Sequence, residues 1–147
     1  APETIENINL EIFIKNICNA NLSLKHEITT VYKKEVETSG RPLQIKRAIQ
    51  NLIDNAKRYS SKINVEVDAN DDSFFITIED NGSGIPAENY ENVFKPFFTL
   101  DPSRNKLKGE SGLGMTIARD IIRSHGGEIK LSSSKMGGLK TIIDLPL

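Results

Sequence analysis

One helix-forming segment carries polar side chains at a spacing that suits a ligand site. In QNLIDNAKRYS the amides Asn51 and Asn55 are four residues apart, and Arg58 and Tyr59 follow one turn later. Residues three and four apart share a face of an α-helix, so these four side chains are expected on one face. Carboxamide oxygens can bind a hard cation such as Mg²⁺, which takes other ligands from water and substrate phosphates. A solvated polar helix face is the alternative interpretation of this pattern.

A glycine-rich turn follows an alternating apolar strand pattern and is the second candidate. It reads Asp80-Asn81-Gly82-Ser83-Gly84-Ile85-Pro86. Two glycines two residues apart let the backbone approach a ligand closely and adopt positive φ. A carboxylate at the strand end, Asp80, can accept a hydrogen bond from an exocyclic amine. Because Asp, Asn and Gly also dominate ordinary turns, a plain turn is the competing interpretation.

The third candidate is the loop Gly109-Glu110-Ser111-Gly112-Leu113-Gly114, which opens a helical pattern. Free backbone N–H groups and the helix dipole make such a junction an anion site. The loop is neither a Walker A motif nor a dinucleotide fingerprint. Positive charge lies upstream, at Arg104, Lys106 and Lys108. An ordinary solvated loop would explain this segment alone, but three such signals in order on one small chain favour a ligand site.

The elements that would position these segments alternate between helices and strands. Apolar residues at three- and four-residue steps predict helices over residues 5–18, 42–59 and 113–124, and a shorter piece over 88–94. Strands are predicted at residues 26–33, 63–67, 74–78, 128–132 and 140–145, with a hairpin around residues 70–72. We expect one α+β domain over residues 1–147, with three main helices on one face of a mostly antiparallel, mixed sheet of about five strands.

Composition narrows the class of protein without indicating its chemistry. The chain has 147 residues, of which 37% are hydrophobic and 27% charged, as in one ordinary globular domain. Its net charge of −1 provides no overall basic field for nonspecific nucleic-acid binding. The single cysteine, Cys18, excludes a disulfide framework and a Cys-based zinc site. No run of about 18 apolar residues and no leader pattern occur, so we expect no membrane span or secretion signal in this sequence.

Taken together, the motifs resemble the catalytic ATP-binding domain of bacterial sensor histidine kinases, a member of the GHKL (Bergerat) superfamily. Four boxes carry the resemblance, namely Asn51-x3-Asn55 (N), Asp80-x-Gly82-x-Gly84 (G1), Phe94-Lys95-Pro96-Phe97 (F) and Gly112-Leu113-Gly114 (G2). The ending SHGGEIKLSSSKMGGLKTIIDLPL is similar to the closing strands of osmosensor-type, EnvZ-like kinases. The resemblance implies a two-layer α/β sandwich, with residues 99–111 as an ATP lid and residues 1–7 as a linker stump.

The resemblance also implies ATP and Mg²⁺ as cofactors, and a role for each matching residue. Asn55 matches the magnesium-binding asparagine, and Asn51 the supporting one. Arg58 matches a basic residue that reaches phosphate, and Tyr59 an aromatic residue bordering the nucleotide. Asp80 matches the aspartate that recognises the adenine amino group. The other implied nucleotide-binding residues are Gly82, Gly84, Ile85, Phe97, Arg104, Lys108, Ser111, Gly112, Leu113 and Gly114. Those expected to act in catalysis are Asn51, Asn55, Arg58 and Arg104.

The residue at position 51 bears on the activity. ATP-hydrolysing relatives of the gyrase, Hsp90 and MutL types carry a glutamate there to activate water. Asn51 cannot act as a general base, whereas phosphoryl transfer depends mostly on positioning and charge stabilisation. We therefore expect transfer of the γ-phosphate to a histidine on a separate dimerisation and phosphoacceptor domain, for relay to an aspartate of a response regulator. The alternatives are a GHKL-type ATPase and a non-catalytic nucleotide-sensing module, the latter favoured by Glu110 in place of a lid glycine.

The phosphoacceptor histidine is expected outside this sequence, which begins at Ala1 and is expected to be part of a longer protein. His26 lacks the Arg-Thr-Pro and helical context of an acceptor, and His125 suits the negative end of a helix dipole. We expect the isolated domain to be a monomer in the cytoplasm. The parent protein is expected to be a homodimer in the bacterial inner membrane, with no nucleic-acid partner.

Overall fold

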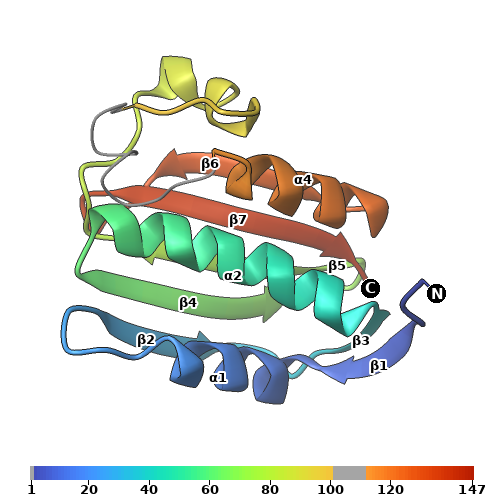
Figure 1. Cartoon of the computed structure of the whole chain (residues 1–147). Coiled ribbons are helices and arrows are strands. Elements are labelled where there is room, and N and C mark those ends of the chain that lie inside the picture. Colours follow the sequence, from blue (N-terminus) through green and yellow to red (C-terminus); the bar gives the residue numbers. More distant parts are fainter. Residues whose placement is uncertain (1, 101–111) are drawn as a thin grey trace.

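The computed structural model describes residues 2–100 and 112–147, so the predicted site residues Arg104, Lys108 and Ser111 lie outside the described residues. The helices are α1 (Leu10–Ala20), α2 (Pro42–Tyr59) and α4 (Gly114–Ser124). The main strands are β2 (Glu27–Tyr32), β4 (Lys62–Ala69), β5 (Ser73–Asp80), β6 (Glu128–Ser133) and β7 (Leu139–Pro146). These strands form one sheet in the order β2-β4-β5-β7-β6, and the three helices cover one of its faces (Figure 1).

The sheet is mixed, because β2 pairs with β4 in parallel whereas the other neighbours are antiparallel. The predicted hairpin joins β4 to β5, and its turn is closed by the Asn70 side chain, which accepts from the backbone N–H of Asp72 and Ser73 at 2.9 and 2.8 Å. The expectation of an α+β domain built on a five-stranded mixed sheet is confirmed.

Helix α2 lies across the middle of the sheet and beside α4 (Figure 1). The helix begins at Pro42, the predicted start, and the Glu3 carboxylate caps it by accepting from the N–H groups of Leu43 and Gln44 at 2.6 and 3.1 Å. Ile49 and Ile53 on its inner face are fully buried. The opposite face is thereby directed away from the sheet, which leaves its polar side chains available for a site.

The prediction of a helix from residue 5 is wrong for its first turn. Residues Glu6–Asn9 form strand β1, which pairs antiparallel with β3 (Glu37–Gly40), a strand that the sequence pattern did not predict. Asn9 separates strand from helix because its side chain accepts from the Ile12 N–H at 3.1 Å as an N-cap. Ile12, an apolar residue within the predicted helix, is exposed, because the buried face of α1 is formed by Leu10, Ile14, Ile17 and Cys18.

The segment between β5 and α4 also differs from its prediction. The helical piece expected over residues 88–94 is two short 3₁₀ turns, η1 (Ala87–Asn89) and η2 (Asn92–Phe94). Only Phe94 of these turns is buried. None of the helices within the described residues is both long and apolar enough to cross a lipid bilayer.

Candidate functional site

A cavity of about 240 Å³ lies where the C-terminal half of α2 faces the start of α4. The four residues singled out on α2 by their spacing, Asn51, Asn55, Arg58 and Tyr59, all line it. Their position follows from the helix itself, because burial of Leu52, Ile53 and Ala56 against the core turns the neighbouring face toward the cavity. The prediction that these four residues share one face is confirmed.

Asn51 ties the two helices together. Its side-chain N–H donates to the carbonyl oxygen of Gly114, the first residue of α4, at 3.2 Å. A Cβ atom at Gly114 would lie 3.9 Å from the Asn51 side chain, which is ordinary contact. Asn51 therefore links α2 to the start of α4, and its side-chain N–H is used in this hydrogen bond to the backbone.

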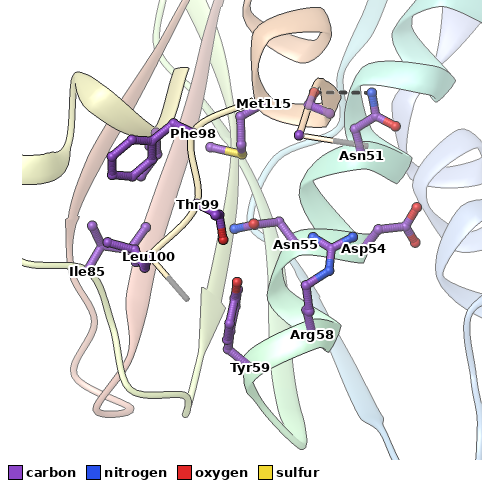
Figure 2. Close-up of a pocket in the computed structure, with 13 residues that line it drawn as sticks. Asn51, Asp54, Asn55, Arg58, Tyr59, Ile85, Phe98, Thr99, Leu100 and Met115 are labelled. Carbon is purple, nitrogen blue, oxygen red and sulfur yellow. Dashed lines mark hydrogen bonds between the residues drawn. The ribbon is translucent and has the colours of Figure 1, made fainter. Parts of the chain in front are cut away.

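Asn55 and Tyr59 extend into the cavity, whereas the Asp54 carboxylate turns away from it (Figure 2). The Asn55 carboxamide makes no hydrogen bond to the part of the chain that the structure describes, so it is available to a ligand. Arg58 is the one cationic side chain among the described lining residues, and Asp54 the one carboxylate. The Asp54 carboxylate accepts from the Gln50 side chain at 2.8 Å, which holds it on the outer rim.

The wall opposite α2 is largely apolar and was not predicted from the sequence. It comprises Ile85, Val93, Phe98, Leu100 and Met115, with Thr99 among them (Figure 2). Of these residues, only Ile85 is among the predicted site residues. The signal for Phe98 was present in the adjacent aromatic pair of FKPFF, but no periodicity indicated which ring would face the cavity. A polar α2 face opposite an apolar wall suits a ligand that has both a flat apolar part and charged groups.

Phe97 has the opposite orientation from Phe98. Its φ of 63° is positive, its side chain is 71% exposed, and it does not line the cavity. Its backbone N–H donates to the carbonyl oxygen of Gly112 at 2.7 Å. The conformation of Phe97 thus directs Phe98 and the next two residues against the cavity. The predicted contact of Phe97 with a nucleotide stays a prediction.

Asp80 is the last residue of β5, and backbone groups surround its carboxylate. It is not among the described residues that line the cavity. The residue is 6% exposed, and its carboxylate accepts from the N–H groups of Gly82 and Leu139 at 2.9 and 3.2 Å. Burial raises the pKa of the Asp80 carboxyl above its usual value, and these two hydrogen bonds lower it in part. A Cβ atom at Gly138 would fall onto this carboxylate. Gly138 is therefore a positioning residue that the sequence analysis missed, because only the β5–β7 pairing brings it there.

Two glycines of the predicted turn have different roles. A Cβ atom at Gly82 would lie 2.6 Å from the Tyr59 carbonyl oxygen, so Gly82 permits close packing against the end of α2. Gly84 adopts a φ of +73°, which favours glycine. Neither residue lines the cavity, and neither does Leu113. Their predicted contacts with a nucleotide, like that of Asp80, stay predictions.

Helix α4 anchors the 3₁₀ segment that leads to the apolar wall. The Thr116 hydroxyl donates to the Phe94 carbonyl at 2.6 Å. The Arg119 guanidinium lies 4.3 Å from the centroid of the Phe94 ring and bonds to the Glu91 carboxylate at 2.7 Å. These contacts fix the position of Val93 and the residues that follow Phe94 relative to the cavity.

The family of this chain follows from comparison with known proteins. The model of the family described as "Histidine kinase-, DNA gyrase B-, and HSP90-like ATPase" matches residues 40–147, and the chain belongs to this family. Membership implies ATP binding. The match covers α2, the glycine-rich turn after β5 and the start of α4, which are the segments that build the site.

Among individual proteins, the chain is similar to the sensor histidine kinase GtrS of Pseudomonas aeruginosa, with 32% identity over 145 residues. It is also similar to the sensor histidine kinase CpxA of Escherichia coli, with 38% identity over 109 residues. These alignments cover 98% and 74% of this chain but only 29% and 24% of the relatives, so the chain spans less than a third of their length.

Solved structures confirm the fold. The mycobacterial sensor histidine kinase MprB matches with a TM-score of 0.83 at 24% identity, covering 97% of both chains. The catalytic domain of the histidine kinase ThkA matches with a TM-score of 0.82, also at 24% identity and covering 97% of both chains.

Proposed function

We propose that this chain is the catalytic domain of a sensor histidine kinase, which binds Mg·ATP and transfers the γ-phosphate to a histidine on a separate dimerisation and phosphoacceptor domain. The phosphate would then be relayed to an aspartate of a response regulator. The observation that carries this proposal is the hydrogen bond from the Asn51 side chain to the Gly114 carbonyl. Position 51 is where the hydrolysing relatives carry a glutamate that activates water. An amide cannot take a proton from water, so the cavity favours transfer to a stronger nucleophile over hydrolysis.

The donor chemistry of the cavity fits magnesium. Asn55 presents a carboxamide that makes no hydrogen bond to the described chain, and a carboxamide oxygen is a ligand type that Mg²⁺ accepts. Asn55 would hold the ion together with the nucleotide phosphates and water. Bound there, Mg²⁺ would offset phosphate charge during transfer. Arg58 would bind phosphate from the same face of α2, and Arg104 and Lys108 would contribute from the lid.

We infer that the adenine end of the nucleotide binds at the glycine-rich turn that follows β5. The Asp80 carboxylate is fixed by two backbone donors and retains acceptor capacity for the exocyclic amine. Gly82, Gly84 and Ile85 would shape this end of the site, with Phe97 as part of the hinge beside the lid. Ser111, Gly112, Leu113 and Gly114 would cradle the phosphates at the start of α4.

One observation favours ATP hydrolysis as a second candidate function. Asp54 lines the cavity and is the one carboxylate among its described residues. Its bond to Gln50 and its outward orientation in Figure 2 argue against a role in activating water. An Asp54→Asn variant separates the two functions, because a hydrolase that uses Asp54 would lose phosphate release, whereas the proposed kinase would not.

The experiment for the proposed function combines binding with transfer. ATP is titrated into the chain with and without Mg²⁺, and γ-labelled ATP is then incubated with the phosphoacceptor domain from the same gene. Acid-labile label on the acceptor, dependent on Mg²⁺, is the expected result. ATP binding without transfer would support the nucleotide-sensing alternative, and release of inorganic phosphate by the chain alone would support the ATPase.

The finer parts of the proposal rest on the sequence resemblance. They are an EnvZ-like osmosensor subtype, a homodimeric parent protein in the bacterial inner membrane, and a cytoplasmic, monomeric isolated domain. The closing segment from Ser124 to Leu147 supports the subtype.

A further inference from the structure

A second, open groove of about 550 Å³ lies at the C-terminal end of α2, on the side of the α1–β2 loop. Three cationic side chains line it, Lys25, Lys57 and Arg58, and no carboxylate is among its described lining residues. Arg58 and Tyr59 also line the nucleotide cavity, so the two sites adjoin. The groove is therefore a local positive region on a chain whose net charge is −1.

The groove is held in shape by hydrogen bonds of the α1–β2 loop and of the last turn of α2. Both ring nitrogens of His26 are engaged, one with the Ser23 hydroxyl at 3.1 Å and one with the Lys57 carbonyl at 2.8 Å. These bonds fix the α1–β2 loop against the end of α2, at the same end of the fold in Figure 1. The Ser60 hydroxyl donates to the Ala56 carbonyl at 2.6 Å and closes the last turn of the helix.

The two lysines have no ion-pair partner in the described parts of the chain. The Lys57 ammonium donates to the neutral Asn21 side chain at 3.3 Å, which leaves its charge uncompensated. The nearest residues in sequence to Lys25 include Leu24, which is fully exposed, and Leu22, which is more than half exposed. Leu22 and Leu24 thus add exposed aliphatic surface in the loop that supplies Lys25 and His26 to the groove.

These features distinguish between kinds of occupant. A small anion would be poorly enclosed by an open groove with flexible lysines. A nucleic acid requires positive charge along several phosphates, whereas the groove has three cationic side chains on a chain whose net charge is −1. A protein segment with carboxylates and an apolar side chain could form ion pairs with the lysines and pack against the leucines.

We propose that this groove binds an acidic segment of a partner protein, next to the nucleotide cavity. Carboxylates of the segment pair with Lys25 and Lys57, and its apolar side chain packs on Leu24. The site is independent of the phosphotransfer proposed above, and it is occupied whether or not the chain transfers phosphate. Because Arg58 and Tyr59 are shared, the bound segment lies against residues that contact the nucleotide cavity.

The test is a titration of the ¹⁵N-labelled chain, followed by amide chemical shifts, with a peptide of alternating Glu and Leu. Shifts at residues 22–26 and 57–61 are expected. A matched peptide with Gln for Glu should produce none. The Lys25→Glu, Lys57→Glu double variant should weaken peptide binding about tenfold or more, and Leu24→Ser should weaken it without a change of charge.

The control is Lys130→Glu, which makes the same type of charge reversal on an exposed residue of β6. It should change peptide affinity less than about twofold at physiological ionic strength, because screening limits distant charges. If Lys130→Glu weakened peptide binding as much as the double variant, the effect would be one of overall charge, and the proposal would be overturned. It would also be overturned by absence of shifts in the groove, by stronger binding of an oligothymidylate of equal charge, or by full competition from inorganic phosphate. The amide spectrum of each variant reports whether it is folded.

Discussion

The backbone N–H of Phe97 donates to the carbonyl oxygen of Gly112 at 2.7 Å, and both residues adopt positive φ. The bond joins the chain before the apolar wall to the chain that enters α4. Phe98, Thr99 and Leu100 follow directly on one side, and Gly114 and Met115 on the other, and all five line the cavity. This backbone contact therefore helps to set the shape of the cavity, together with the bonds from α4 to Phe94 and from Asn51 to Gly114.

Gly112→Ala should weaken ATP binding about tenfold or more. A Cβ atom there would lie 2.7 Å from the Phe97 Cα, and a φ of +74° adds backbone strain of about 1–3 kcal/mol. The matched control is Gly126→Ala, which has a similar φ of +82° but only ordinary contact with Pro146 at 3.5 Å. Calorimetric titration with ATP distinguishes them. Similar losses of affinity in both variants would show that strain alone, and not the contact with Phe97, is responsible.

Asn55→Ala should abolish Mg²⁺-dependent phosphotransfer while the domain remains folded. The side chain lies in the cavity and outside the core, so its removal should change the free energy of unfolding by about 0.5 kcal/mol or less. Asn64→Ala, which removes an amide on the outer face of β4, is the control. Transfer of labelled phosphate to the acceptor domain is measured. If the Asn55 variant transfers phosphate as well as wild type, the magnesium assignment is wrong.

Asp80→Asn should weaken binding of ATP more than binding of GTP. The amide oxygen can still accept from the N–H groups of Gly82 and Leu139, so the local fold should persist. A charged hydrogen bond to the adenine amino group would be lost, which corresponds to about 10- to 100-fold in ATP affinity. Competition with a fluorescent nucleotide gives both affinities. Equal losses for ATP and GTP would remove the role in adenine recognition.

Asp80 should also make the stability of the domain depend on pH. Burial raises the pKa of its carboxyl in the folded state, so the folded state binds the proton more tightly than the unfolded state. The resulting stabilisation is fully present below the unfolded pKa, and it is lost as pH rises through the folded pKa. Urea denaturation from pH 3.5 to 7 should show this decline in wild type and a smaller decline in Asp80→Asn. Parallel profiles would assign the pH dependence to other carboxyl groups.

Local sequence patterns predicted the parts of this fold that depend on local periodicity. The face of α2 with Asn51 and Asn55 was predicted correctly because the helical period alone determines it. Strand β1 was misread because Ile5 and Ile8 suit a helix as well as a strand. Its true state depends on pairing with Thr38 and Gly40 of β3, some thirty residues away in the chain. Such non-local pairings leave no periodic signal within a single short segment.

The sequence also predicted only part of the site, because non-local contacts build the rest. Motif glycines such as Gly114 could be identified, whereas Phe98 and Gly138 could not. Phe98 faces the cavity because Phe97 adopts a positive φ, and no residue type in FKPFF indicates that conformation. Gly138 encloses Asp80 because β5 and β7 are neighbours, which is a property of the sheet order. Tertiary contacts therefore determine the apolar wall and the Asp80 enclosure, while helical spacing determines the polar face.

Arg119→Ala should destabilise the domain by about 1–2 kcal/mol and weaken ATP binding, because it removes both a stacking contact and an ion pair. The Arg119 side chain is 15% exposed, and it joins α4 to Phe94 and Glu91 beside the cavity wall. Arg123→Ala is the matched control on the same helix. Its pair with Glu128 at 3.1 Å is half exposed, so its loss should cost about 0.5 kcal/mol or less. Urea denaturation and ATP titration of both variants provide the comparison. Equal effects on stability would show that the Phe94 contact adds nothing to a surface ion pair, and unchanged ATP affinity in Arg119→Ala would show that η2 does not set the cavity wall.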